Sequence, residues 1–187
     1  MYGIIRHGYK AEYTHVATLF GRESTLVGQV VDRFAAAIVL EFKECIRLPN
    51  ELECRQYMLD FMVQRGAPGV IGALDGKHWT TVMGNDDLYS YKDFHGNKSL
   101  TMLAIVNVKY KFWWVSDFFA GATHAGRIWN RSGLKDLLDN ELFPFQSSRF
   151  KLMGTWYSAH IMTDSAFAKS RYFCKPQKRS LLLDDPG

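Results

Sequence analysis

The hydrophobic period of this chain changes at Gly66, and that change most constrains what the chain can fold into. Before it, apolar residues recur at the spacing of amphipathic helices. After Gly69, the apolar stretches are short and rich in β-branched and aromatic residues, which is typical of strands. We therefore expect a mixed α/β fold with two regions, a helical one over residues 1–66 and a sheet domain over residues 67–187. A length of 187 residues suits one sizeable core.

The helical region contains three predicted helices. Residues 11–44 hold two of them, with Gly21 ending the first and Ser24 or Thr25 capping the second. A third helix is expected from about Glu51 to Gln64. The first two fit a helix-turn-helix module, and they fit equally a helical pair packed on the main domain, because nothing in them is diagnostic of base reading.

The sheet domain begins with "VIGALDG", an apolar run that predicts a strand ending on Asp75. "WTTVM", "LTMLAIVNVKY" and "KFWWVSDFFA" predict further strands, and "NVKYKF" predicts a hairpin between the last two. "RIWNRSGLKDLLDNELF" returns to helical spacing. "SAHIMTDSAFAKSRYF" predicts a short strand approaching Asp164 and then another helix.

Asp75 and Asp164 share a local pattern, because each follows an apolar stretch and precedes a small residue. A carboxylate in that place either caps a turn or holds a cation, since a buried charge without a partner is costly. If the two strands are neighbours, both carboxylates emerge at one edge of the sheet. Paired carboxylates suit Mg²⁺ or Mn²⁺, so the pair is a candidate metal site for phosphodiester chemistry.

Two histidines are further candidates, His78 in "DGKH" and His124 in "GATHAG". Neither belongs to a zinc-binding pattern, so we expect them to make hydrogen bonds or to contact substrate. A basic run near the C-terminus either follows a phosphate backbone or is a solvated surface; it comprises Arg171, Lys175, Lys178 and Arg179.

Composition limits the partners and the compartment. A net charge of +4 permits a polyanionic partner without requiring one. The three cysteines form no CxxC pair, which argues against a zinc ribbon or a disulfide framework. No signal-peptide core and no run long enough to span a bilayer is present, so we expect an intracellular protein, nuclear or cytoplasmic, and not a secreted one.

Several motifs, taken in order, resemble the nuclease domain of PIF/Harbinger transposases and their domesticated relatives. They are "GAPGVIGALDGKHW", "YSYKDFHGNKSLTMLAIVNVKYKFWWVSDFFAGATHAGRIWNRSGL" and "IMTDSAFAKSRYFCKP". The stretch "LFGRESTLVGQVVDRF" is similar to the helix-turn-helix that precedes the nuclease in that family. The resemblance covers most of the chain from about Thr14 to Pro176.

The resemblance implies an RNase H-like fold with a DDE acidic triad that binds divalent metal and cuts DNA. The family's first aspartate corresponds to Asp75, with His78 as the motif histidine, and the second corresponds to Asp164. His124 is the histidine of a second motif. The resemblance also implies DNA as the substrate and a Myb-like DNA-binding protein as a partner; it does not give an oligomeric state.

This sequence departs from the family pattern at several places. Ala125 follows His124 where the family has aspartate, Asn107 stands where an aspartate is usual, and Thr163 replaces a glycine. The family's third acidic residue, a glutamate well beyond the second aspartate, has no counterpart before Gly187. We therefore expect a nuclease domain truncated at its C-terminus, with weak or no activity. The alternative is a catalytically dead remnant that binds DNA or protein.

Overall fold

The computed structural model describes residues 12–81, 91–144 and 148–175. The chain divides into two compact units, residues 1–46 and 47–187. The predicted boundary after residue 66 would place the third helix with the first two, whereas in the structure this helix lies in the second unit. Each unit is described separately below.

The first unit contains two helices, α2 (Tyr13–Phe20) and α3 (Ser24–Glu41). As predicted, Gly21 ends the first helix, since its backbone N–H bonds the carbonyls of the last turn. The predicted cap on the second helix is wrong: Glu23 occupies the N-cap position, and its side chain makes no capping bond. The core of this unit is small and consists of Val16, Ala17, Val27 and Val31, with Phe20 against them.

The second unit begins with α4 (Glu51–Arg65), close to the predicted bounds. A capping box starts the helix: the Asn50 side chain accepts from Glu53 N–H, and the Glu53 carboxylate accepts from Asn50 N–H. The helix buries Cys54 and Met58 in the main core. Phe61 packs with Val70 in a smaller cluster. Helix α4 therefore anchors the start of the central sheet.

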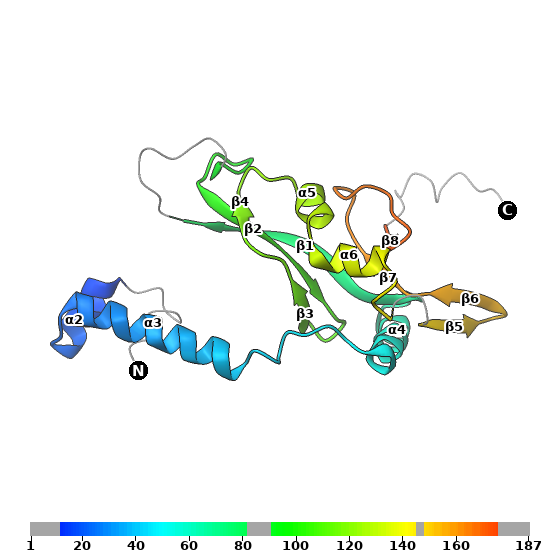
Figure 1. The fold of residues 1–187 in the computed structure, drawn as a ribbon, viewed down its shortest axis with the longest axis horizontal. Helices are drawn as coiled ribbons and strands as arrows, with labels where there is room; N and C mark the ends of the chain where they lie inside the picture. Colours follow the sequence, from blue (N-terminus) through cyan, green and yellow to red (C-terminus); the bar gives the residue numbers. More distant parts are fainter. Residues whose placement is uncertain (1–11, 82–90, 145–147, 176–187) are drawn as a thin grey trace. The chain divides into compact units, whose positions relative to one another are not determined.

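A mixed sheet of six strands forms the centre of this unit (Figure 1). Its strands are β1 (Val70–Thr80), β2 (Ser99–Val106), β3 (Phe112–Val115), β4 (Phe119–Ala120), β7 (His160–Met162) and β8 (Phe173–Cys174). The order is β3-β2-β1-β7-β8, with β4 also paired to β2. Strands β1, β2 and β3 are antiparallel, whereas β7 runs parallel to β1 and β8 parallel to β7. The predicted hairpin at "NVKYKF" is confirmed as the β2–β3 connection.

Two short helices, α5 (Ala125–Asn130) and α6 (Gly133–Asp139), pack on one face of the sheet. They replace the single helical segment expected there, because Ser132 caps a new helix by accepting from Lys135 N–H at 3.2 Å. A separate hairpin, β5 (Arg149–Leu152) and β6 (Thr155–Ser158), forms its own two-stranded sheet and was not predicted. The main core combines the sheet with both helices and includes Leu74, Leu103, Ile105, Ile128, Leu134, Leu138 and Ile161.

The fold class is confirmed as a mixed α/β sheet with flanking helices, preceded by N-terminal helices. Two local predictions are wrong. Strand β1 does not end at Asp75 but continues to Thr80, because β2 pairs with it as far as Ser99. The helix expected after Asp164 is a turn followed by β8, because Phe167 and Tyr172 are both buried in the core and hold this segment against the sheet.

Candidate active site

The two faces of β1 carry different kinds of residue. Asp75, Lys77 and Trp79 are exposed, whereas Leu74, just before them, is buried and Gly76 and His78, between them, are half-buried. His78 shares the face of Leu74, since it lies opposite the buried Thr101 of β2. The register between β1 and β2 runs without a break from Ala73 to Thr80, so the alternation holds throughout. Asp75 and His78 therefore lie on opposite faces of the sheet.

Asp75 and Asp164 both lie just beyond the point where β1 and β7 pair. Ala73 of β1 pairs with Met162, the last residue of β7, and each aspartate lies two residues further along the chain. The inner residues Ile161 and Thr163 are buried, whereas Asp164 is exposed. If the register continued for two residues past Met162, the two aspartates would share one face, and neighbouring strands lie about 5 Å apart in a sheet.

Each carboxylate makes one local hydrogen bond. Oδ1 of Asp75 accepts from Gly76 N–H at 2.7 Å, and Oδ1 of Asp164 accepts from Ala166 N–H at 3.0 Å. No described residue bonds the second oxygen of either group. Two exposed carboxylates with a free oxygen each fit the preference of Mg²⁺ and Mn²⁺ for oxygen ligands that leave room for water. In the described part of the chain, no cluster of three or more acidic, histidine or cysteine side chains could hold a metal ion.

His78 is held by two hydroxyl groups on β2. Its Nδ1 lies 2.8 Å from Thr101 Oγ1 and 3.3 Å from Ser99 Oγ. The ring of Phe94 meets the His78 ring edge-on, with centroids 5.7 Å apart. His78 is therefore fixed on the inner face and does not share a site with Asp75.

His124 caps helix α5. Its Nδ1 accepts from Gly126 N–H at 3.2 Å, and the side chain is otherwise exposed. Ala125, at the position where the family resemblance leads one to expect an aspartate, is the first residue of this helix. The structure brings His124 and His78 together, because both line one cavity of about 480 Å³ that also includes Ala166.

Asp93 is a residue of this region that the sequence reasoning missed. It is 9 % exposed and accepts from His95 N–H at 2.9 Å and Asn97 N–H at 3.0 Å. Burial raises the pKa of its carboxyl, but the hydrogen bonds from Asn97 and His95 outweigh burial, so the pKa lies below its ordinary value. The pattern Asp-x-x-Gly-Asn, typical of a turn, is the signal that could have located it.

Two other residues depart from the family pattern: Asn107, whose side chain accepts hydrogen bonds, and Thr163, whose side chain is buried. Asn107 closes the β2–β3 turn, with Oδ1 accepting from Lys109 N–H at 3.0 Å and from Lys111 N–H at 3.1 Å. Thr163 is 3 % exposed, and its hydroxyl has no hydrogen-bond partner among the described residues. Neither residue adds a carboxylate to the pair formed by Asp75 and Asp164.

The basic run predicted to follow a phosphate backbone is only partly described. The guanidinium of Arg171 lies over the ring of Tyr172, 4.9 Å from its centroid, and Lys175 donates to the carbonyl of Phe167. Lys178 and Arg179 lie outside the described residues. No helix within the described ranges is long and apolar enough to cross a bilayer.

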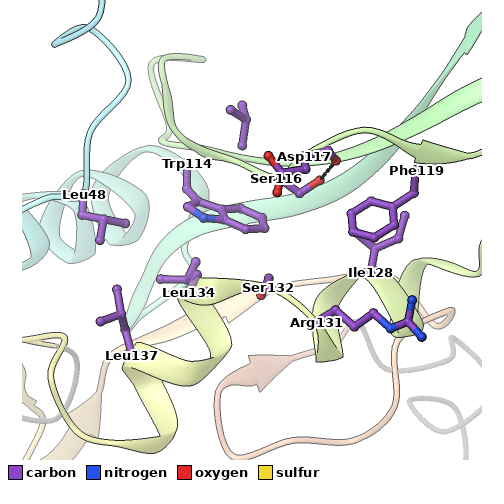
Figure 2. A pocket seen from close by; sticks show the side chains of 12 residues that line it. Leu48, Trp114, Ser116, Asp117, Phe119, Ile128, Arg131, Ser132, Leu134 and Leu137 are labelled. Atoms are coloured by element: carbon purple, nitrogen blue, oxygen red, sulfur yellow. Dashed lines mark hydrogen bonds between the residues drawn. The ribbon is translucent and has the colours of Figure 1, made fainter.

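A second cavity, of about 290 Å³, lies between the β3–β4 segment and helices α5 and α6 (Figure 2). Its walls combine apolar side chains, among them Trp114, Phe119 and Leu134, with the polar Asp117 and Arg131. None of the four predicted site residues lines it.

No curated protein and no solved structure matches the chain. The family model of the DDE superfamily endonuclease matches residues 74–185, which is more than half of the chain. The match begins one residue before Asp75 and includes Asp164. Members of this superfamily generally use divalent metal ions. This chain therefore belongs to the DDE superfamily of endonucleases.

Proposed function

We propose that residues 47–187 form a transposase-derived DNA endonuclease domain of the Harbinger type that depends on a divalent metal. The observation that carries the proposal is the parallel pairing of Ala73 with Met162, two residues before the exposed Asp75 and Asp164, which would bring the two carboxylates to one place. The family match supports the endonuclease reaction, and the order of motifs in the sequence supports the Harbinger assignment.

Asp75 and Asp164 would hold the metal through their free carboxylate oxygens. When bound, Mg²⁺ or Mn²⁺ supplies activation of a water or a 3′-hydroxyl and stabilises the leaving oxygen of a phosphodiester. The protein's own contribution is orientation: the hydrogen bonds from Gly76 and Ala166 fix one oxygen of each carboxylate and leave the other directed to solvent. We assign His78 and His124 to substrate contact, because both line one cavity. We assign His78 no role in holding the metal, because it lies on the other face of β1 from Asp75.

A second candidate is a remnant that binds DNA or a protein without cutting. It is favoured by the absence of a third carboxylate beside the pair among residues 12–81, 91–144 and 148–175. Two ligands hold a metal less firmly than three, and much of the rate depends on the charge of the ion. We therefore propose slow cleavage at most, and a Myb-like protein as a partner that would supply DNA targeting in the nucleus.

The test is cleavage of supercoiled plasmid DNA with Mn²⁺ or Mg²⁺ by the full chain. Asp75→Asn and Asp164→Asn remove one charge each at exposed positions, and Asp136→Asn on α6 is a matched control for the loss of an exposed carboxylate. Metal-dependent nicking by the wild type and the control, lost in both site variants, supports the endonuclease. Binding of DNA without nicking supports the remnant.

A further inference from the structure

The cavity shared by His78 and His124 is lined mainly by small residues. Gly121, Ala122, Ala125 and Ala166 contribute walls with little side-chain volume, and the volume of about 480 Å³ is ample for a single heterocyclic base. The cavity lies on the inner face of β1, three residues beyond Asp75, which corresponds to about 10 Å along a strand. It is therefore close to the aspartate pair but distinct from it.

Phe94 forms an aromatic wall of this cavity and is 80 % exposed. Its ring is positioned by two contacts, edge-on with His78 and tilted against His95 with centroids 3.9 Å apart. Covering an exposed apolar ring with a ligand is favourable, because it removes apolar surface from water. Such a ring is a stacking platform for a flat ligand.

The polar groups of the cavity suit a neutral, flat ligand. Nδ1 of His124 accepts a backbone hydrogen bond, so the neutral ring carries its proton on Nε2, where it can donate. Nδ1 of His78 is bonded to Thr101, and no described residue bonds its Nε2. Asp93 and Lys92 also line the cavity, so the two charged residues there have opposite signs and give it no net charge. The described residues offer no metal-binding cluster there.

We propose that this cavity binds one unstacked nucleobase of the DNA, stacked on Phe94 and hydrogen-bonded by His78 and His124. The inference rests on the proposed function, because it takes DNA as the substrate. Because Ala166, two residues after Asp164, lines the cavity, the base would belong to a nucleotide near Asp164, and its capture would hold the strand beside that aspartate. Extruding a base costs the unpairing energy, which is lowest in single-stranded DNA.

The experiment uses single-stranded oligonucleotides carrying 2-aminopurine, whose fluorescence rises when the base leaves its stack, with EDTA present so that cleavage plays no part. Three variants of the full chain are compared with the wild type. Phe94→Ala removes the platform, Ala122→Trp fills the cavity, and Phe112→Ala removes an exposed phenylalanine of β3 that does not line it. Circular dichroism checks that each variant folds.

We expect Phe94→Ala to weaken binding roughly 5- to 150-fold, the range for losing one stacked base. Ala122→Trp should weaken it similarly, and both should abolish the fluorescence rise that the wild type and Phe112→Ala show. Wild-type binding that neither cavity variant weakens would overturn the nucleobase site and leave the proposed endonuclease intact. A wild type that binds no DNA would overturn the proposed function and this inference with it.

Discussion

Asp75 and Asp164 each lie two residues beyond Ala73 and Met162, the pair that joins the parallel strands β1 and β7. Both aspartates are exposed, and the alternation of β1 turns Asp75 outward. The same alternation turns His78 to the inner face, where Thr101 holds it. The four predicted site residues thus comprise two exposed aspartates and two histidines that line one cavity.

Removing the Thr101 hydroxyl should weaken the fold modestly. Thr101 is 2 % exposed and its Oγ1 lies 2.8 Å from Nδ1 of His78, so Thr101→Val loses one partly buried hydrogen bond at nearly constant volume. We expect the free energy of unfolding to fall by about 0.5–1.5 kcal/mol. Urea denaturation measures the change, with Thr80→Val, at the exposed end of β1, as the control. Equal free energies of unfolding for Thr101→Val and Thr80→Val would contradict a stabilising hydrogen bond between Thr101 and His78.

Gly72 permits the close packing of the sheet beneath Trp113. A Cβ at this position would lie 2.5 Å from Ile105 Cγ2 and 2.7 Å from Trp113 Nε1. Gly72→Ala should therefore destabilise the fold by about 1–3 kcal/mol, the usual cost of overpacking. Gly133→Ala is the control, since a Cβ there meets nothing within 4 Å. A thermal melt in which Gly72→Ala is no less stable than that control would show that the core around Trp113 is looser than described.

Glu53 should make stability depend on pH in the acid range. The side-chain hydrogen bond from Arg47, with the backbone bond from Asn50, lowers the pKa of Glu53 from 4.5 to about 2. Because the folded-state pKa is lowered, the ionised group stabilises the fold above pH 4.5, and this contribution is lost as pH falls through about 2.

The variants Glu53→Gln and Arg47→Met test that contribution. Each should be less stable than the wild type at neutral pH, and the difference should shrink as pH falls from 4.5 to about 2. The measurement is the free energy of unfolding in urea at a series of pH values. A difference that stays constant over this range would mean that the Arg47–Glu53 contact does not perturb the carboxyl.

The three cysteines should separate into two reactive thiols and one inert thiol. Cys45 and Cys174 are exposed, whereas Cys54 is buried and burial raises its pKa to about 12. Since the thiolate is the reactive form, a thiol reagent should label two cysteines quickly and the third only on unfolding. Counting labelled thiols by mass spectrometry with and without urea tests this. Fast labelling of all three cysteines in the native protein would contradict the burial of Cys54 between α4 and the main core.

Local pattern was sufficient for elements whose ends carry their own signals. Gly66 ends α4 and Gly21 ends α2, and both ends were predicted from sequence because the capping preference is local. Strand β2 was predicted from its apolar and β-branched residues, although two of its four inner residues, Ser99 and Thr101, carry hydroxyl groups. These locally specified elements are sufficient to predict a mixed α/β fold class without any long-range contact.

Elements decided by long-range pairing were mispredicted. Strand β1 continues past Asp75 only because β2 pairs with it, and no property of "GKHWT" alone indicates this. The segment after Asp164 has helical composition, yet burial of Phe167 and Tyr172 keeps it irregular. The β5–β6 hairpin did carry a local signal, alternation around Met153-Gly154, a two-residue turn with both φ angles positive at 47° and 85°.

The candidate site shows the same division. The pattern of an apolar run followed by aspartate selected Asp75 and Asp164, but the pairing of β1 with β7 that brings their strands together is a long-range contact. His78 was expected to make hydrogen bonds or to contact substrate, and its odd spacing from Asp75 within β1 places it on the other face, where Thr101 bonds it. Asp93 was overlooked because its burial depends on the turn that its own carboxylate closes.

The most direct test of the central claim is calorimetric titration of Mn²⁺ into the full chain. The wild type and Asp136→Asn should bind the ion, and Asp75→Asn and Asp164→Asn should each lose binding, because the two carboxylates hold one site. Folding of every variant is checked by circular dichroism. Binding retained by either site variant, or absent from a well-folded wild type, would contradict the claim that this pair of aspartates forms a metal site.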